Sequence, residues 1–319
     1  MQDNTKQIEV PSIQWFPGHM AKTRRLIGEN LKLVDMVLEI TDARIPMSSR
    51  NPQLDTWIST KPRIIMLNKS DNADGNMTRK WLAYYKAKGI PAIACDCKSG
   101  NGTAQFMPLV KEVLAELLDR RDQKGMSGRM TRIMVVGIPN VGKSSFINKM
   151  ATSRRTRVED RPGVTVRKQW VSLSKDIELL DMPGVLWPKF EDKLVGERLA
   201  FTGAVKDDVL DMELLAARLT AYLAESYPER LIERYKIEID ETLSGYELLE
   251  AIGRKRGMLI PGGGVNLERA AITLVDEYRS GKLGKITFEA PPAITTPIQT
   301  KPVEEIPEEE LSTEEMPVE

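Results

Sequence analysis

The stretch Gly137–Ser144 reads G-I-P-N-V-G-K-S and decides the fold of this 319-residue chain. It matches the pattern G-x-x-x-x-G-K-S, in which a glycine-rich turn joins a strand to a helix and cradles phosphate groups. The sequence supplies both neighbours, because the apolar run Arg132–Val136 precedes the turn and a helical pattern covers Lys143 to Met150. Backbone N–H groups at such a turn and the helix dipole both favour an anion. A chance match on an ordinary strand, turn and helix is the alternative, and the flanking pattern disfavours it.

Two further motifs stand in an order that is unusual for this kind of protein. Asn68–Asp71 reads N-K-S-D, an N-K-x-D box that reads a guanine base, and Asp181–Gly184 reads D-M-P-G, a D-x-x-G box that senses a terminal phosphate. A GTPase of ordinary order runs from the phosphate loop through D-x-x-G to N-K-x-D. Here the base reader comes first, so the sequence predicts a circularly permuted P-loop GTPase domain.

Strand-like and helical patterns alternate in the first half of the chain, which predicts an α/β fold: a mostly parallel sheet with helices on both faces. Strands are expected at 34–40, 63–67, 91–94 and 132–136, and the runs at 170–173 and 177–180 predict a hairpin. A helix is expected from Thr78, as its N-cap, to Lys88. The permutation keeps every strand neighbour if the linker Lys124–Arg129 joins the ends of an ordinary GTPase domain, since domain termini often lie close together.

Pattern and composition divide the chain into three segments. Residues 1–190 are predicted to form the permuted GTPase domain, and residues 191–289 a small all-helical domain with breaks at Pro228 and Pro261–Gly264. From Ala290 to the end, eight Glu and one Lys give a charge of −7, and with six Pro they predict a disordered acidic tail. Because the formal net charge of the whole chain is zero, the rest carries about +7. That part either binds a polyanion or has solvated basic faces.

The sequence also indicates where the protein works. No apolar run reaches the roughly 18–20 residues that span a bilayer, and the polar stretch Met1–Pro11 is not typical of a secretory signal. The two cysteines, Cys95 and Cys97, are too few for a disulfide framework or a zinc site. We therefore expect reduced thiols in a cytoplasmic protein.

The phosphate loop and the D-x-x-G box assign residues to the phosphates and to Mg²⁺. Lys143 is expected to reach the β- and γ-phosphates, and the Ser144 hydroxyl is expected to bind Mg²⁺. Asp181 is expected near Mg²⁺ through a water molecule, and the Gly184 N–H is expected to face the γ-phosphate.

The guanine base is assigned to two loops. The Asp71 carboxylate can accept hydrogen bonds from guanine N1–H and from the exocyclic amine, whereas adenine offers neither donor, which disfavours a metabolic ATPase. Asn68 and the Lys69 stem are expected to flank the base. The segment Asp96–Gly100 lies where a Ser-Ala-Lys loop is expected and departs from that pattern, so its backbone is expected to make the contact. The residues expected to bind GTP are Asn68, Lys69, Asp71, Cys97, Lys98, Asn140, Val141, Gly142, Lys143, Ser144, Ser145, Thr165, Asp181 and Gly184.

The switch segments leave the catalytic group open. The D-x-x-G box is followed by Val185, where many GTPases have a glutamine that positions the attacking water. An apolar side chain cannot orient water, so we expect slow GTP hydrolysis by the chain alone. In the other switch segment Thr165 is the expected Mg²⁺ ligand and Thr156 the alternative. Thr165 is also consistent with an ordinary strand residue.

Taken together, these motifs resemble ribosome biogenesis GTPase A (RbgA/YlqF-like), a family of circularly permuted bacterial GTPases that assemble the large ribosomal subunit. The resemblance covers roughly Trp15 to Ile286. It rests on Trp15–Met20 (W-F-P-G-H-M), on Asp42–Pro46 (D-A-R-I-P), on the permuted order of the motifs and on the hydrophobic residue after Asp181–Gly184.

The resemblance implies further roles. It implies a helical C-terminal domain that contacts ribosomal RNA, for which the basic residues Arg254, Lys255 and Arg256 are the candidates. It implies that the histidine of the P-G-H-M motif, His19, assists hydrolysis, although a structural side chain that anchors the N-terminal loop is the plainer interpretation. It also implies that Asn140, in the phosphate loop, binds an activating K⁺.

The resulting hypothesis is a GTP-hydrolysing assembly factor for the large ribosomal subunit that binds the precursor and its RNA in the GTP state. The ribosomal particle is expected to stimulate hydrolysis, and hydrolysis to release the protein. The chain runs from the D-x-x-G box directly into the helices, so nucleotide state is expected to bias the helical domain. The alternative is a GTPase switch whose helical domain binds a protein partner.

Overall fold

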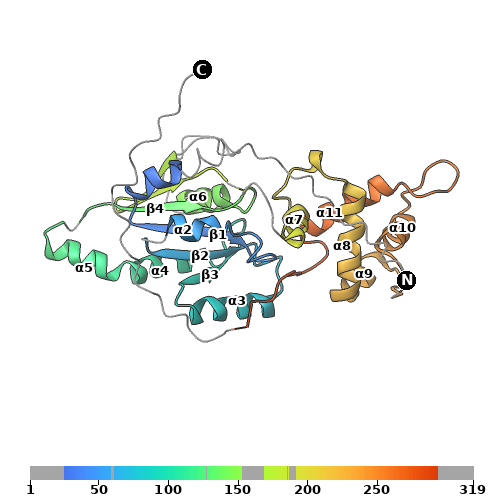
Figure 1. Ribbon diagram of the computed structural model, residues 1–319, viewed down its shortest axis with the longest axis horizontal. Coiled ribbons are helices and arrows are strands. Elements are labelled where there is room, and N and C mark those ends of the chain that lie inside the picture. Colours follow the sequence, from blue (N-terminus) through green and yellow to red (C-terminus); the bar gives the residue numbers. More distant parts are fainter. Residues whose placement is uncertain are drawn as a thin grey trace, which may run out of the picture.

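A six-stranded sheet forms the centre of one half of the molecule (Figure 1). The structure is a computed structural model that describes residues 25–58, 61–126, 128–152, 169–184, 186, 192–240 and 242–293. The strands are β1 (Met36–Asp42), β2 (Arg63–Asn68), β3 (Ala92–Ala94), β4 (Thr131–Val136), β5 (Gln169–Ser174) and β6 (Ile177–Asp181). Their order is β3-β2-β1-β4-β6-β5. Of these strands only β5, paired with β6, runs antiparallel, which confirms the mostly parallel sheet and the expected hairpin.

Helices cover both faces of this sheet. The helices of this half of the molecule are α2 (Gln53–Trp57), α3 (Gly75–Ala87), α4 (Phe106–Val113), α5 (Ala115–Gln123) and α6 (Lys143–Thr152), with a 3-10 turn η1 (Thr103–Gln105). On one face, alternate side chains of β1 pack with α4 and α6, and the rings of Phe106 and Phe146 meet edge to face with centroids 5.0 Å apart. On the other face, α2, α3 and the helical residues 25–31 bury the remaining strand side chains. Side chains that alternate along buried strands thus produce two apolar layers.

Helix α3 begins earlier than the sequence predicts. Asp74 is its N-cap, because the Asp74 side chain accepts hydrogen bonds from the N–H groups of Asn76 and Met77. The expectation that Thr78 caps this helix is wrong. Thr78 lies in the first turn, where its hydroxyl donates to the Asp74 carbonyl at 2.8 Å. A carboxylate that satisfies two free N–H groups fixes the helix start more firmly than a hydroxyl placed one turn later.

The helical region (residues 192–280) follows the last strand. Its helices are α7 (Lys193–Phe201), α8 (Met212–Ser226), α9 (Pro228–Tyr235), α10 (Gly245–Lys255) and α11 (Leu267–Arg279), with a 3-10 turn η2 (Asp207–Val209). Helix α8 contacts α7, α9, α10 and α11. Ser244 and Glu247 form a capping box at the start of α10. A Cβ on Gly245 would lie 2.0 Å from the Ala217 carbonyl oxygen, so only glycine allows this close approach of α10 to α8.

After α11 the chain returns to the sheet region (residues 25–186). This return segment, Gly281–Glu289, runs back toward α3 in dark red (Figure 1). Its Phe288 ring lies 5.3 Å from the Phe201 ring of α7, and the Trp81 Nε1–H of α3 donates to the Glu289 carbonyl at 2.9 Å. One cluster of buried apolar side chains continues from the sheet into the helices. The return segment therefore packs against both the sheet region and the helical region.

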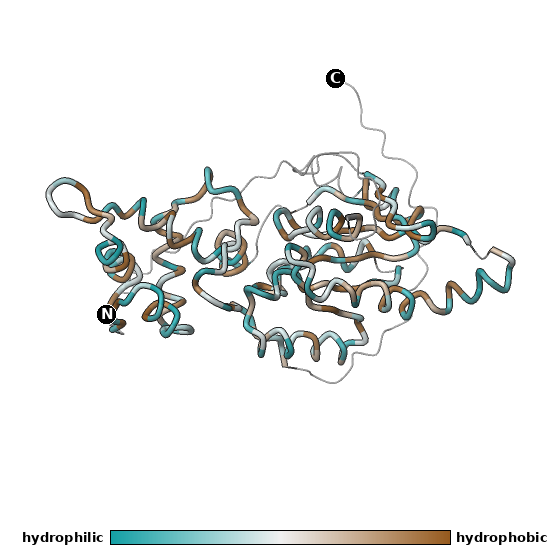
Figure 2. Tube along the Cα trace, turned by 180° about the vertical axis from the view of Figure 1, so that it is seen from behind, coloured by the Kyte–Doolittle hydropathy of each residue, from teal (hydrophilic) through white to brown (hydrophobic). Residues whose placement is uncertain are grey.

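The distribution of apolar residues is that of a water-exposed surface around packed interiors. Figure 2 shows brown segments along the strands, and brown residues that alternate with teal ones along the helices. No helix among the described residues is both long and apolar enough to cross a membrane. The turn between α10 and α11 projects from the end of the helical region farthest from the sheet (Figures 1 and 2).

Candidate nucleotide-binding site

The three motifs meet at the carboxyl edge of the sheet. β2 ends at Asn68, β6 ends at Asp181, and β4 ends one residue before Gly137. These strands are parallel, either directly paired or on both sides of β1, so their carboxyl ends lie at the same edge. Ligands of parallel α/β sheets bind at this edge. The permuted chain order has therefore left the relative placement of the motifs intact.

The phosphate loop needs its glycines for close approach. Gly137 has φ 151°, and a Cβ there would lie 2.4 Å from the Ile40 carbonyl oxygen of β1. Gly142 has φ 103°, and a Cβ there would lie 2.2 Å from Asn68 Nδ2. The loop is thus pressed against β1 on one side and against the N-K-x-D box on the other. Only glycine fits either position without moving a neighbour.

Lys143 is held by the backbone of the phosphate loop. Its ammonium donates to the carbonyls of Gly137 (3.1 Å) and Ile138 (2.9 Å), and the residue is 7% exposed. Burial lowers the pKa of Lys143 to about 8, against an opposing contribution from the Asp181 carboxylate. A Cβ on Gly184 would lie 2.8 Å from Lys143 Nζ. The backbone of Gly184 in the D-x-x-G box therefore packs closely against the ammonium group of Lys143, which is expected to contact the phosphates.

The oxygen donors near this lysine suit Mg²⁺. Ser144 is the second residue of α6, and Asp181 pairs in register with Val135 of β4, next to the phosphate loop. Hydroxyl and carboxylate oxygens are the hard ligands that Mg²⁺ prefers, and its remaining positions are usually filled by phosphates and water. No cluster of three or more His, Cys, Asp or Glu side chains that could hold a metal occurs in the described part of the chain. These few protein oxygens fit a Mg²⁺ ion whose remaining ligands are nucleotide phosphates and water.

Asn68 joins three loops. Its Nδ2 donates to the Val141 carbonyl of the phosphate loop at 2.7 Å, and its Oδ1 accepts from the Cys97 N–H at 2.9 Å. Residues 68 and 141 are 73 positions apart in sequence, so this side chain closes a long loop. It fixes the base-reading box against the phosphate loop.

The loop Asp96–Gly100 has its own means of holding shape. The Asp96 carboxylate accepts from the N–H groups of Lys98 and Ser99, both at 2.9 Å. Burial would raise the pKa of Asp96, and these hydrogen bonds instead hold it below its usual value. Lys149 of α6 donates to the Ser99 carbonyl at 2.7 Å. An aspartate-centred turn thus takes the place where the sequence departs from Ser-Ala-Lys.

Two further expected residues are Asp71 and Asn140. Asp71 is exposed three residues after the end of β2, and Asn140 is in the left-handed region with φ 57°. Asn140 Nδ2 donates at 2.7 Å to the carbonyl of Gly203, just beyond the end of α7. No sequence pattern signals this contact between the phosphate loop and the helical region. Cys95 and Cys97 are buried free thiols.

Some expected residues cannot be placed. His19, Thr165 and the alternative Thr156 lie outside the described residues, as do Val185 and the tail from residue 294 onward. Buried partners that sequence reasoning missed are Asp42, Arg44 and Glu289. The first two belong to D-A-R-I-P, which marked the family resemblance but carried no role.

The basic residues proposed for RNA lie at the end of α10. Arg254 pairs with Glu250 at 2.8 Å, and both side chains are about half exposed. Arg256 pairs with Glu277 at 3.2 Å and lies over the Tyr235 ring. Lys255 is exposed. Beyond them, an antiparallel bridge between Leu259 and Val265 closes the projecting turn around Pro261–Gly264.

Known proteins share both regions of the chain. A family model described as 50S ribosome-binding GTPase matches residues 132–242. The chain is 49% identical over 280 residues to ribosome biogenesis GTPase A of Bacillus cereus, a match that covers 88% of this chain and 94% of that protein. It is 32% identical to mitochondrial ribosome-associated GTPase 1 of Xenopus tropicalis, over 86% and 94% of the two chains.

Solved structures agree with this likeness. The fold resembles GDP-bound TM YlqF with a TM-score of 0.62 and 28% identity, over 84% of this chain and 99% of that one. GNP-bound YlqF from T. maritima gives a TM-score of 0.57 and 29% identity, over 84% and 98%.

Proposed function

Because the chain belongs to the ribosome biogenesis GTPase A family, we propose that this GTPase assembles the large ribosomal subunit, binding a precursor and its RNA with GTP and leaving after hydrolysis. The extent of the match carries the proposal. It covers 94% of the B. cereus protein, so it includes the helical region as well as the nucleotide site. Such a role belongs to the cytoplasm.

The nucleotide site divides its work between the two ends of GTP. The loop Gly137–Ser144 binds the phosphates through backbone N–H groups, with Lys143 turning from its carbonyl contacts to the β- and γ-phosphates. Asp71 reads guanine, and the backbone of Cys97 and Lys98 completes the base pocket.

GTPases of this family depend on Mg²⁺. The Ser144 hydroxyl, Asp181 through water and Thr165 are its proposed protein donors. Bound there, Mg²⁺ neutralises charge on the phosphate oxygens. K⁺ is proposed to bind the amide oxygen of Asn140, whose amide nitrogen donates to the Gly203 carbonyl.

The helical region is proposed to be the part that meets RNA, within a division into residues 1–190, 191–289 and the acidic tail 290–319. Arg254 and Lys255 stand exposed beside a turn that projects from the far end of the molecule. Arg256 belongs to the same proposed RNA surface, although its guanidinium is paired with Glu277.

One observation favours the alternative of a protein partner. The projecting turn also exposes two large apolar side chains, Leu259 (52%) and Ile260 (46%). Exposed apolar groups of this kind are typical of a protein interface. The two alternatives differ in salt dependence, because phosphate contacts release counterions and an apolar interface does not.

Cosedimentation with large-subunit precursors tests the proposal. We expect binding with a non-hydrolysable GTP analogue, release with GDP and a steep decrease in binding as salt rises.

GTP turnover by the protein alone should be slow, and particles should accelerate it by less than the roughly 10³–10⁵-fold of an arginine finger. It should also be faster in K⁺ than in Na⁺. A His19→Ala variant should bind nucleotide and show reduced stimulated turnover. Equal binding in both nucleotide states would contradict the proposal, and a wild-type rate for the variant would leave His19 structural.

A further inference from the structure

The lysine of the N-K-x-D box is held by a carboxylate from the neighbouring strand. Lys69 Nζ lies 3.0 Å from Asp42 Oδ2, and Asp42 is only 2% exposed at the end of β1. The backbone of Lys69 is in the left-handed region with φ 60°, a conformation that a residue with a side chain adopts only where its surroundings impose it. The direction of the Lys69 stem is therefore set by its backbone conformation at one end and by the contact with Asp42 at the other.

The Asp42 carboxylate is itself fixed by Arg44. The Arg44 backbone N–H (3.0 Å) and Nε (2.9 Å) donate to Oδ1, and Nη2 (2.8 Å) donates to Oδ2. Burial would raise the pKa of Asp42, but the charges of Arg44 and Lys69 hold that pKa well below its usual range. Asp42 thus stays ionised and available to Lys69 at every pH at which the protein works.

Arg44 is positioned by the C-terminal part of the chain. Its guanidinium lies 5.1 Å from the centre of the Tyr278 ring of α11, and its carbonyl accepts from the Phe288 N–H at 2.8 Å. The side chain is 1% exposed. An arginine buried to this degree, with a forked contact to one carboxylate and a ring across its face, has little freedom to move.

The return segment also holds the base-reading turn on its other side. The Ile286 N–H donates to the Asn72 carbonyl at 3.1 Å, and the Asp74 N–H donates to the Thr287 hydroxyl at 3.0 Å. A Cβ on Gly281 would lie 2.2 Å from the Asn72 side chain. The turn that carries Asp71 is thus gripped between β1 and residues 281–289.

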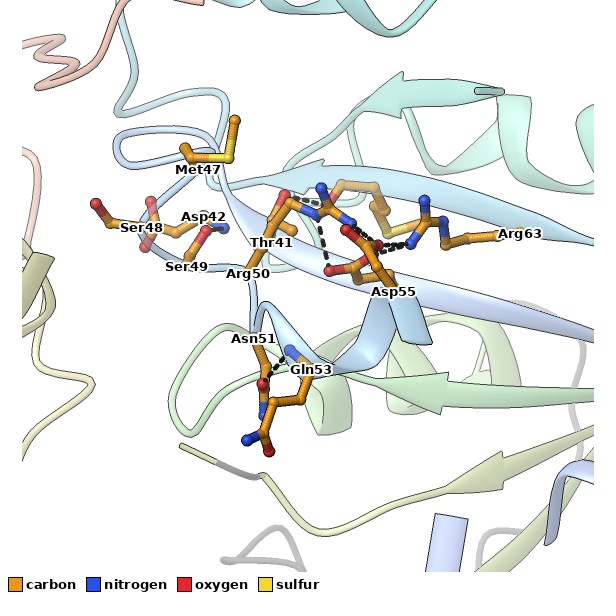
Figure 3. Close-up of polar contacts among 12 residues, drawn as sticks. Thr41, Asp42, Met47, Ser48, Ser49, Arg50, Asn51, Gln53, Asp55 and Arg63 are labelled. Carbon is orange, nitrogen blue, oxygen red and sulfur yellow. Dashed lines mark hydrogen bonds and ion pairs between the residues drawn. The ribbon is translucent and has the colours of Figure 1, made fainter. Parts of the chain in front are cut away.

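The loop after β1 provides a firm base for these contacts. The Ser49 hydroxyl accepts from the Asp42 N–H at 2.9 Å, and Arg50 bridges Glu39 and Asp55 at 3.0 and 2.6 Å (Figure 3). The Glu289 carboxylate accepts from the N–H of Met47 at 2.6 Å and is also paired with Arg198 of α7. The return segment therefore closes on a loop that is fixed from within.

We propose that Asp42 is a positioning residue for Lys69, and that Arg44 and the return segment transmit the docking of the helical region to the guanine-base pocket. This inference rests on the proposed base-reading role of the N-K-x-D box. The contacts of Asp42, Arg44 and the return segment lie on the base side of the site, whereas the contact of Asn140 with Gly203 lies on the phosphate loop. The helical region thereby sets how tightly GDP and GTP are held, independently of the γ-phosphate.

Asp42→Asn tests the first link, since it keeps the shape and removes the charge that faces Lys69. We expect about tenfold weaker binding of GDP and of GTP, through faster dissociation of a fluorescent GDP. Inosine diphosphate should weaken by the same factor, because the Lys69 stem covers the base face and does not read the exocyclic amine. KM for GTP should rise, while kcat at saturating GTP changes less than twofold. A partly unfolded population would instead lower the apparent kcat. Wild-type affinity in the folded variant overturns the proposal.

Thr287→Val tests the second link and remains informative if Asp42→Asn fails to fold. It removes the acceptor for Asp74 N–H without changing side-chain volume, and we expect GDP to dissociate about threefold faster. Thr273→Val is the matched control, since the Thr273 hydroxyl donates only within α11, to the Arg269 carbonyl. Equal rates for Thr287→Val and Thr273→Val contradict the transmission. Asp71→Asn separates this inference from the proposed function. If Asp71→Asn leaves base preference unchanged, the base-reading assignment is wrong. If it changes base preference while the Asp42 and Thr287 variants bind nucleotide like the wild type, only this inference is wrong.

Discussion

At the scale of single residues, the lowered pKa of Lys143 predicts that nucleotide binding is coupled to proton uptake. Its pKa of about 8 in the free protein must rise when phosphates surround it, because they favour the charged form. Binding of GDP should therefore take up about half a proton at pH 8 and about a tenth at pH 7, and affinity should fall as pH rises above 8. Calorimetry in two buffers of different ionisation enthalpy measures this uptake. No difference between the buffers at pH 8 would mean that Lys143 is already charged.

Asp71 makes a prediction about base choice. Its carboxylate is exposed and can accept from the two donors of guanine. In Asp71→Asn the amide can donate to the carbonyl that xanthine carries where guanine has its amine. We expect preference to move from GTP toward xanthosine triphosphate, measured by competition binding. Unchanged GTP affinity, with no gain for the xanthine nucleotide, would remove Asp71 from the pocket.

The sequence predicted the roles of residues that belong to short motifs, where the deciding neighbours are adjacent in the chain. The motifs around Lys143 and Asp71 are of this kind, so their spacing was enough to predict that they lie at strand ends. It did not predict that Asp42 faces Lys69, because that contact depends on how two neighbouring strands end. The division at Ala290 kept Glu289 out of the tail, but it gave no sign that this carboxylate is buried against the loop after β1.

At the scale of elements, the end of α10 makes a prediction about RNA. Arg254→Gln with Lys255→Gln should weaken particle binding and reduce its salt slope by roughly one unit for each phosphate that is no longer neutralised. The double variant keeps Arg256, whose pairing with Glu277 would confuse the result. Arg79→Gln with Lys80→Gln, an adjacent exposed basic pair on α3, is the matched control. A wild-type salt slope in the first variant would place the RNA interface elsewhere.

Element boundaries show where local pattern is sufficient. The hairpin β5–β6 and the strands before each motif matched their expected positions within one or two residues, because apolar runs bounded by turns define them. Helix α3 did not, since the competition between Asp74 and Thr78 for the cap is decided by which N–H groups each side chain can reach.

At the scale of the whole molecule, the order of the motifs predicted the circular permutation directly. The sequence did not predict how the C-terminal part of the chain docks on the nucleotide site. The sequence predicted that the D-x-x-G box couples the helices to the nucleotide. The structure adds two contacts with the C-terminal part of the chain: Asn140 with Gly203 at the phosphate loop, and the return segment at the base side. Both join residues far apart in sequence, which periodicity cannot detect.

The return segment also orders events during synthesis of the protein. The hydrogen bond between Met47 and Glu289 spans 242 residues. At about 5–20 residues per second, translation takes roughly 12–48 s to cover that interval. Once residue 144 has been made, the nascent chain has both the N-K-x-D box and the phosphate loop, but until residue 289 it lacks the complete return segment that holds the turn after β2. A chain that is cut short before residue 289 therefore never completes this grip.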